Sequence, residues 1–294
     1  MTRKLKDDEF LITNQTIKNE DTLVTKNEIY RQLAQQVNSK LVGVPLKLQI
    51  YNLAQRQPEK EFINWVDKKP KREKRLVSLL SKKQVVQLKK TWVGINNSIK
   101  NTGEPPAIFS ESSTENSLRK IESWYWNHGW FNAKANYEIQ KDTTNQKIEI
   151  QYSVEPGALY TIDSISENIA SPAADSLYQL IKAENQIKLG KAYNTEEFNT
   201  DRDNISRFFR NHGLFHFEKE NISFYADTIN NNQRINLELN IQNRVIDNRD
   251  SLQTEPFKVH KISEVNVFSD YDGSTTKVED SVRYKNYNIY SLQQ

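Results

Sequence analysis

Histidine is the residue type in this chain best suited to acid–base or metal chemistry, because the 294-residue sequence has four histidines and no cysteine. His128 and His212 each stand in an Asn-His-Gly motif, and His212 and His216 have the four-residue spacing of zinc ligands on a helix. Gly213 stands between these two and favours the end of a helix over its middle. We therefore expect His128, Gly129, His212 and Gly213 to be structural caps, where a cation also favours the helix dipole.

Other patterns that support catalysis are missing from the sequence. It contains no His-Glu-x-x-His motif, no glycine-rich phosphate loop and no nucleophile elbow. Asp201 and Asp203 could act as paired carboxylates, but no base or oxyanion partner accompanies them. The aromatic cluster at 124–131 could stack on a sugar or a base, but its spacing favours core packing, with Trp126 exposed. We expect no enzyme, no cofactor and no metal site.

The overall charge is close to balance, since 41 Lys and Arg against 38 Asp and Glu give +3, and 36% of the residues are hydrophobic. Residues 67–90 depart from this balance, because ten basic residues stand there with only Asp67 and Glu73, a net charge of +8. The basic residues are Lys68, Lys69, Lys71, Arg72, Lys74, Arg75, Lys82, Lys83, Lys89 and Lys90. Such a patch could bind nucleic acid, approach anionic lipid, or form an ordinary solvated helix face.

An internal repeat is the clearest sign of how the chain is organised. Residues 121–131 match residues 205–215 at an offset of 84, and residues 145–154 match residues 232–241 after a slip of three residues. A repeat of this length corresponds to a whole small domain and not to one turn of a solenoid.

Each copy predicts the same order of elements. Helical spacing at 114–128 and 198–212 ends at a glycine, and alternation of apolar and polar residues at 148–154 and 235–241 is typical of a half-buried strand. The other predicted elements are first strands at 10–17 and 160–166, first helices at 27–36 and 171–181, and second strands at 133–140 and 217–225. The fold class is therefore α+β, with the order strand–helix–helix–strand–strand (βααββ) in each unit.

We expect three segments along the chain. Residues 1–156 form the first unit, with a helical insertion at 41–102, and residues 157–245 form the second. Residues 246–294 comprise a linker and the incomplete start of a third unit, which begins at His260 and has neither a helix pair nor a closing hairpin after Val267. No signal peptide is visible, and we expect the chain to be cut from a longer protein.

The repeated motifs resemble a known family. The run Gly190-Lys-Ala-Tyr-Asn, followed by Asp201-Arg and Gly213-Leu-Phe, looks like the signature of POTRA domains, the periplasmic βααββ modules of the BamA/TamA-type outer-membrane assembly proteins. The stretch from Gly103 to Phe131 looks like a divergent second copy. Insertion motifs such as Gly43-Val-Pro-Leu, Lys69-Pro-Lys-Arg-Glu and Thr102-Gly-Glu-Pro-Pro resemble TamL-like proteins, the lipoprotein members of this family in Bacteroidota.

This resemblance implies tandem POTRA-like domains that serve as a periplasmic interaction arm of an outer-membrane protein translocation and assembly factor. The partners it implies are a TamB-like protein that spans the periplasm and unfolded outer-membrane protein clients. We expect attachment to the outer membrane through a C-terminal barrel and an N-terminal lipid outside this sequence. Under this interpretation the basic patch at 67–90 meets an anionic membrane surface or a protein, and no nucleic acid.

The resemblance also places the second strand of each unit at a sheet edge, where backbone groups could pair with an incoming strand. The candidate edge residues are Ala133, Ala135, Tyr137, Ile139, Phe217, Lys219, Asn221, Ile222 and Phe224. The alternative function is a basic nucleic-acid-binding module centred on residues 67–90.

Overall fold

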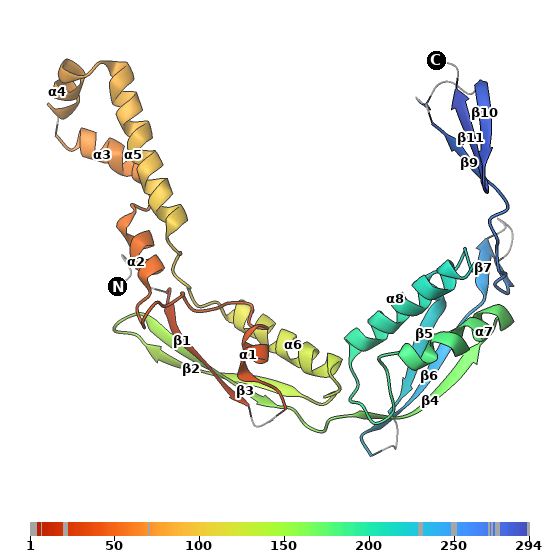
Figure 1. The fold of residues 1–294 in the computed structure, drawn as a ribbon. Helices are drawn as coiled ribbons and strands as arrows, with labels where there is room; N and C mark the ends of the chain where they lie inside the picture. The colour runs from red at the N-terminus through yellow and green to blue at the C-terminus, as the bar shows by residue number, and fades with distance from the viewer. Residues whose placement is uncertain are drawn as a thin grey trace. The chain divides into compact units, whose positions relative to one another are not determined.

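The computed structural model describes residues 5–6, 8–19, 23–69, 71–228, 232–247, 252–269, 271, 273 and 277–292. The chain divides into two compact units, Met1–Leu159 and Tyr160–Gln294, and each contains helices and small sheets. Figure 1 shows the elements of both units. No helix in the described part of the chain is long and apolar enough to cross a membrane.

Unit 1 contains a three-stranded sheet in which the last strand is central. Its strands are β1 (Leu11–Asn19), β2 (Lys134–Asp142) and β3 (Lys147–Glu155), in the order β1-β3-β2. β3 pairs in parallel with β1 and forms an antiparallel hairpin with β2. The helices α1 (Lys26–Tyr30) and α6 (Glu111–Asn127) lie over one face of this sheet (Figure 1).

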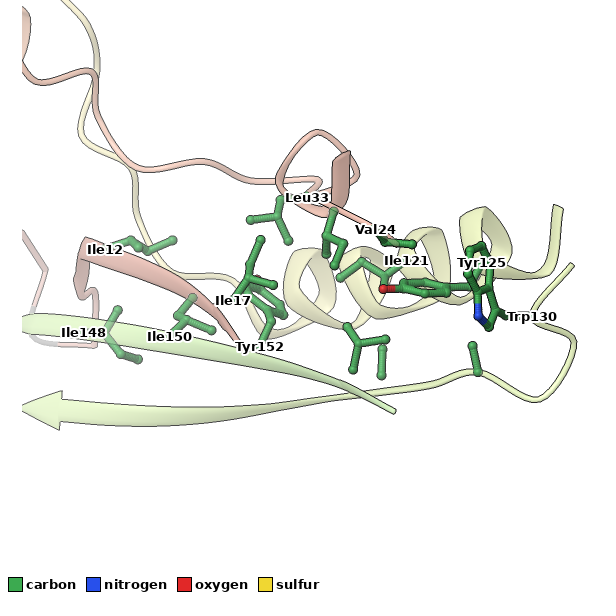
Figure 2. Packing of buried hydrophobic residues seen from close by; sticks show 14 residues of the cluster. Ile12, Ile17, Val24, Leu33, Ile121, Tyr125, Trp130, Ile148, Ile150 and Tyr152 are labelled. Atoms are coloured by element: carbon green, nitrogen blue, oxygen red, sulfur yellow. The ribbon is translucent and has the colours of Figure 1, made fainter. Parts of the chain in front are cut away.

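The core of unit 1 forms between α6 and alternate residues of β3 (Figure 2). Ile148, Ile150 and Tyr152 are at most 2% exposed, because every second side chain of a strand points to the same face. Tyr125 of α6 belongs to the same cluster, and its hydroxyl donates a hydrogen bond to Asn19 Oδ1 at 3.2 Å. The hydroxyl thus has a polar partner at the rim of an otherwise apolar core.

The insertion between α1 and α6 is helical, as expected. It contains α2 (Leu46–Leu53), α3 (Pro58–Asp67), α4 (Arg72–Leu79) and α5 (Lys82–Thr102). Asn96 of α5 is buried; its side chain accepts from the Gln55 N–H at 2.8 Å and donates to the Trp92 carbonyl at 3.0 Å. Gly103 passes so close to α2 that a Cβ there would lie 2.5 Å from the Tyr51 backbone nitrogen.

A polar clamp joins the two chain segments that enter and leave the insertion. Buried Asn38 donates to the Pro105 carbonyl at 2.7 Å and accepts from the Ala107 N–H at 3.0 Å. Beside it, Ser39 Oγ donates to Glu104 Oε2 at 2.6 Å, and this hydrogen bond lowers the pKa of the Glu104 carboxyl. The clamp holds the two ends of the insertion together. The sheet and α6 can therefore pack as if a short loop joined the segments on either side of the insertion.

Unit 2 repeats the topology of unit 1. Its strands β4 (Thr161–Ile169), β5 (Ile222–Asp227) and β6 (Arg234–Ile241) lie in the order β4-β6-β5, with β6 parallel to β4 and antiparallel to β5. The helices α7 (Pro172–Ile181) and α8 (Thr195–Asn211) lie over one face of this sheet (Figure 1). The inward side chains of β6 are buried, as in β3. The predicted α+β fold, with repeated βααββ units and a helical insertion in the first, is confirmed.

The chain after β6 forms more structure than the sequence predicts. β7 (Arg244–Asp247) and β8 (Leu252–Glu255) pair as a hairpin, and Phe257 is buried in the core of unit 2. β9 (Val265–Phe268), β10 (Val278–Tyr284) and β11 (Tyr287–Leu292) form a third sheet in the order β10-β11-β9. The expectation of no closing hairpin after Val267 is wrong, because β10 and β11 form one. No helix lies between β9 and β10 in the residues described there.

Two predicted boundaries move because other hydrogen bonds occupy the backbone. The helix expected at 27–36 ends at Tyr30, and the Ala34 N–H donates to Ser117 Oγ of α6 at 3.0 Å instead of continuing the helix. The strand expected to begin at His260 begins at Val265, because the His260 N–H donates to the Gly213 carbonyl at 2.7 Å.

The predicted strand at 217–225 is wrong in its first half. A short 3-10 helix, η2 (Lys219–Asn221), precedes β5. The Asn221 side chain closes this turn, since its Oδ1 accepts from the Glu218 N–H at 3.0 Å while the Asn221 N–H donates to the Glu218 carbonyl at 3.1 Å. A local side-chain contact of this kind leaves no periodic signal in the sequence.

The second helix of each unit ends in the same way. The C-cap residues are His128 and His212, and the glycines that follow both have φ of +95°. Each histidine Nδ1 lies within hydrogen-bond distance of the carbonyl four residues earlier, at 2.7 and 2.8 Å. In unit 2 the chain also passes close by, since a Cβ on Gly213 would lie 2.7 Å from the His260 carbonyl oxygen and 2.8 Å from Val259 Cγ1.

A buried carboxylate ties α8 to the loop after the 3-10 helix η1 (Lys182–Glu184). Asp201 is fully buried, and its two carboxylate oxygens accept from the Gln186 and Ile187 N–H groups at 2.7 and 3.0 Å. Burial raises the pKa of the Asp201 carboxyl, and the two donated hydrogen bonds oppose that rise. Asp203 is exposed and lies 3.7 Å from Lys219 Nζ, so the two aspartates do not form a carboxylate pair.

Replacing Asp201 with alanine should destabilise unit 2 by roughly 2–4 kcal/mol, because two buried N–H groups would lose their acceptor. Asp203→Ala is the matched control. Its exposed ion pair should contribute at most about 0.5 kcal/mol. Denaturant unfolding of both variants measures the difference, and equal losses would contradict a structural role specific to Asp201.

Replacing Gly213 with alanine should cost more stability than replacing Gly190. Both glycines have positive φ, but a Cβ on Gly190 meets nothing within 4 Å. The Gly190→Ala loss therefore reports backbone strain alone, on the order of 1–2 kcal/mol. Gly213→Ala should exceed it by about 1 kcal/mol and shift the amide resonance of His260. If the two variants lose equal stability, residues 259–260 move aside without cost, and their close approach to Gly213 does not affect the free energy of unfolding.

Candidate partner-binding edges

Each βααββ sheet has two edges, and in both units the first-strand edge is covered where the strand begins. In unit 1 the Ile12 N–H of β1 donates to the Ala107 carbonyl at 2.8 Å. In unit 2 the Ile162 N–H of β4 donates to the Lys191 carbonyl at 2.8 Å. The covering segment in both cases leads directly into the second helix.

β2 forms the opposite edge of the sheet in unit 1. Its successive residues direct their backbone N–H and C=O groups alternately toward β3 and away from it. The Ala135 N–H donates to Glu122 Oε1 at 3.0 Å and so points away from β3. Because the N–H and C=O of one residue in an antiparallel strand share a side, Tyr137 and Ile139 also direct their backbone groups outward. Ile139 is 43% exposed, whereas Ala133 precedes the strand and is buried along with Ala135.

β5 forms the matching edge of unit 2. The Gln242 N–H donates to the Asn221 carbonyl at 3.0 Å, so Asn221 and every second residue after it face β6. Ile222, Phe224 and Ala226 therefore direct their backbone groups outward. The Ile222 side chain is buried, Phe224 is partly buried and Ala226 is exposed.

Three candidate edge residues of unit 2 lie elsewhere. Phe217 is 1% exposed, and its ring packs against Phe209 and Phe257 with centroids 4.7 and 4.9 Å apart. Lys219 and Asn221 belong to η2 and not to the strand. Sequence reasoning also missed Ala226, which the alternation from Phe224 would have identified once the strand was placed correctly.

The ten basic residues at 67–90 are not equivalent in the structure. Lys68 is the C-cap of α3, Lys69 follows it, and the others lie at the N-cap of α4 or within α4 and α5. Lys89 Nζ lies 2.9 Å from Glu59 Oε1 and so joins α5 to α3. A smaller set lines one open cavity of about 560 Å³: Lys69, Lys71, Arg72 and Arg75. We call these four residues the cationic cluster.

An apolar pocket of about 420 Å³ lies beside the cationic cluster. It is lined by Gln55, Glu61, Phe62, Trp65, Leu88 and Trp92. The guanidinium carbon of Arg72 lies 4.6 Å from the centroid of the Trp65 ring, which connects the pocket with the cluster. Sequence reasoning did not single out Trp65. Trp65 lies in α3 and Arg72 begins α4, so their contact crosses a break between helices and leaves no helical period in the sequence.

In the part of the chain that the structure describes, no group of three or more His, Cys, Asp or Glu side chains is placed to hold a metal ion. His216 and His260 pack edge to face with ring centroids 5.2 Å apart, and desolvation, Arg244 and His260 lower the pKa of His216. In the aromatic cluster Tyr125 is buried, whereas Trp126 is 49% exposed.

Comparison with known families and structures gives one sequence match. Residues 70–157 match the POTRA family model, described as "Surface antigen variable number repeat". The match runs from the beginning of α4 through β3 and leaves out β1 and α1. Curated proteins gave no match in the same comparison.

Several solved structures resemble the chain weakly. They include BamA POTRA domains 3–5 from Haemophilus influenzae, with 13% identity over 81% of this chain and 98% of that chain and a TM-score of 0.29. POTRA domains 1–3 of Omp85 from Anabaena share 8% identity over 98% and 96% with a TM-score of 0.31. CdiB from Escherichia coli shares 10% over 82% and 28% with a TM-score of 0.28. TM-scores this low do not support an argument about this chain. The resemblance to the POTRA family is the sequence match at residues 70–157, and unit 2 repeats the helix and hairpin arrangement of that range.

Proposed function

We propose that this chain is a non-enzymatic interaction arm of an outer-membrane protein assembly or translocation factor, and that it binds extended protein segments by strand addition. The POTRA match at residues 70–157 supports the family part of this proposal. The observation that carries the binding part is the difference between the two edges of each sheet. β1 and β4 hydrogen-bond to a neighbouring backbone segment where they begin, whereas the outer side of β2 meets a side chain, Glu122, at Ala135, and β5 pairs with β6 in the sheet.

Strand addition suits these edges for a physical reason. Outward N–H and C=O groups at alternate residues form the same hydrogen bonds with any extended chain, so pairing reads little of the client sequence. The strands are short, with nine residues in β2 and six in β5. A short strand buries little area and must order a flexible client, so the affinity should be weak. Weak binding fits a client that is captured and then passed on.

The finer assignment is to a TamL-like protein that works in the periplasm with a TamB-like partner and unfolded outer-membrane protein clients. Its support is the sequence of the insertion, whose motifs at Gly43, Lys69 and Thr102 resemble those proteins. We further propose that residues 1–156, 157–245 and 246–294 act as separate domains of this arm. The alternative function, a nucleic-acid-binding module centred on residues 67–90, receives no support from the sheet edges. Variants of the basic residues in that range test it.

The edge mechanism predicts that proline at an outward position weakens client binding and spares the fold. Ile139→Pro and Ala226→Pro each remove one outward donor, because neither N–H faces the central strand. A lost backbone hydrogen bond costs about 1 kcal/mol, so affinity for a synthetic peptide of alternating apolar and polar residues should fall roughly fivefold or more. Titration followed by amide shifts in NMR measures the affinity and locates the site.

The matched controls are Ile139→Thr and Ala226→Thr, which keep the donor in a residue that favours strands. They should bind near the wild-type level. Asp227→Pro serves as a second control, since that N–H faces β6 and its loss should unfold the edge. The mechanism is wrong if the peptide shifts residues of the insertion and leaves β2 and β5 unchanged.

A further inference from the structure

We infer that α3, α4 and α5 form a docking surface for an anionic phospholipid bilayer, in which the apolar pocket takes an acyl chain and the cationic cluster takes headgroup phosphates. This surface shares no residue with β2 or β5. The test of this inference is therefore independent of the test of strand addition.

The apolar half of the surface consists of large side chains that the protein leaves partly in water. Trp65 is 48% exposed, Leu88 41% and Trp92 40%, and of the apolar residues lining the pocket only Phe62 is buried. Trp92 Nε1 donates to Gln55 Oε1 at 3.2 Å, which fixes the indole at the pocket wall. Exposed apolar groups gathered around a concave site mark a binding surface, and tryptophan suits the boundary between water and hydrocarbon.

The cationic half lies directly beside it. Lys69, Lys71, Arg72 and Arg75 line one cavity, and none of them forms an ion pair with a carboxylate that the structure describes. Arg72 joins the two halves, because its guanidinium donates to the Trp65 carbonyl and lies over the Trp65 ring. Arginine binds phosphate through parallel N–H donors, and lysine adds positive charge near a phosphate surface.

A bilayer matches this pair of features better than a nucleic acid does. A nucleic acid would neutralise the cations but supply no hydrocarbon for the pocket between α3 and α5. The surroundings continue the same pattern, since Leu79 is 82% exposed and Val86 51% exposed, close to Lys82 and Lys83. Helices that carry basic residues together with exposed Trp and Leu, as α4 and α5 do with Leu79, Leu88 and Trp92, are typical of segments that lie in a membrane interface. A bilayer supplies phosphates and acyl chains together over the whole of such a surface.

The test uses the full chain and vesicles of phosphatidylcholine prepared with and without phosphatidylglycerol. Sedimentation at low salt should show binding to the anionic vesicles, weaker binding at high salt, and little binding to pure phosphatidylcholine. Lys69, Lys71 and Arg75 changed together to Gln should lower binding on the order of tenfold or more. Arg72 is kept in this variant because it supports Trp65.

Two matched controls separate local recognition from net charge and from general aromatic contact. Lys134, Lys188 and Lys258 changed together to Gln remove the same charge from exposed positions elsewhere and should leave binding nearly unchanged. Vesicles with brominated acyl chains should quench tryptophan fluorescence. Trp65→Phe and Trp92→Phe should each reduce this quenching, whereas Trp126→Phe, on the exposed face of α6, should not. Circular dichroism checks that each variant is folded.

Several outcomes would overturn the inference. The first is no binding to anionic vesicles at low salt, and the second is equal binding to anionic and neutral vesicles. The third is an equal loss of vesicle binding in the two triple variants. Retention of a DNA duplex or an acidic peptide by the cationic cluster, with vesicles inert, would assign the surface to that class of ligand instead. Ala226→Pro should bind vesicles as the wild type does, so a failure here leaves the strand-addition result unaffected.

Discussion

The parallel pairing of the first strand with the last strand is the constraint that organises each unit. Parallel neighbours cannot be joined by a hairpin, so the chain must cross one face of the sheet between them, and both helices lie in that crossover. The last strand then sits between its parallel partner and its hairpin partner. Its inward side chains meet the helices from the middle of the sheet, which is why those of β3 and β6 are almost completely buried.

The same constraint makes the two edges of each sheet different. The first strand adjoins the crossover, and the segment leading into the second helix pairs with it at Ile12 or Ile162. The second strand follows the second helix directly, and in unit 1 a side chain of that helix reaches the strand's outer side, where the Ala135 N–H donates to Glu122 Oε1. An edge of this kind invites self-association, and charged residues such as Lys134 and Glu138 on β2 counter that tendency. The position of β2 and β5 at a sheet edge therefore follows from the strand order.

The parts of the fold that the sequence predicts are those in which burial imposes a period. One-sided burial gives β3 and β6 their alternation, and positive φ after each second helix requires glycine. The strand predicted at Phe217 is wrong because that side chain is buried against Phe209 and Phe257, and the turn after it is closed by Asn221, a contact that has no period. In β10 the apolar residues Val278, Val282 and Tyr284 fall on one parity, but Asp280 interrupts them and the described side chains of the strand are exposed, so burial does not reinforce a strand signal there. For the candidate edges the sequence also does not tell whether odd- or even-numbered residues direct their backbone N–H and C=O groups away from the central strand. Hydrogen bonds such as that of the Ala135 N–H reveal it.

The insertion places a second surface on unit 1 without using its core. The clamp around Asn38 and Glu104 holds the two ends of the insertion together. Beyond it Leu48 of α2 still packs with Leu11 of β1, and the exposed apolar and basic residues lie on α3, α4 and α5. Burial within the insertion is sparse, since α4 buries none of its described side chains and α5 buries only Asn96. Helices with so little burial are held together in part by polar contacts such as Asn96 with Gln55, and their large apolar residues stay at the surface. Those residues gather beside cations that no described carboxylate neutralises, so hydrophobic and electrostatic free energy can both be gained there when a surface of matching chemistry binds.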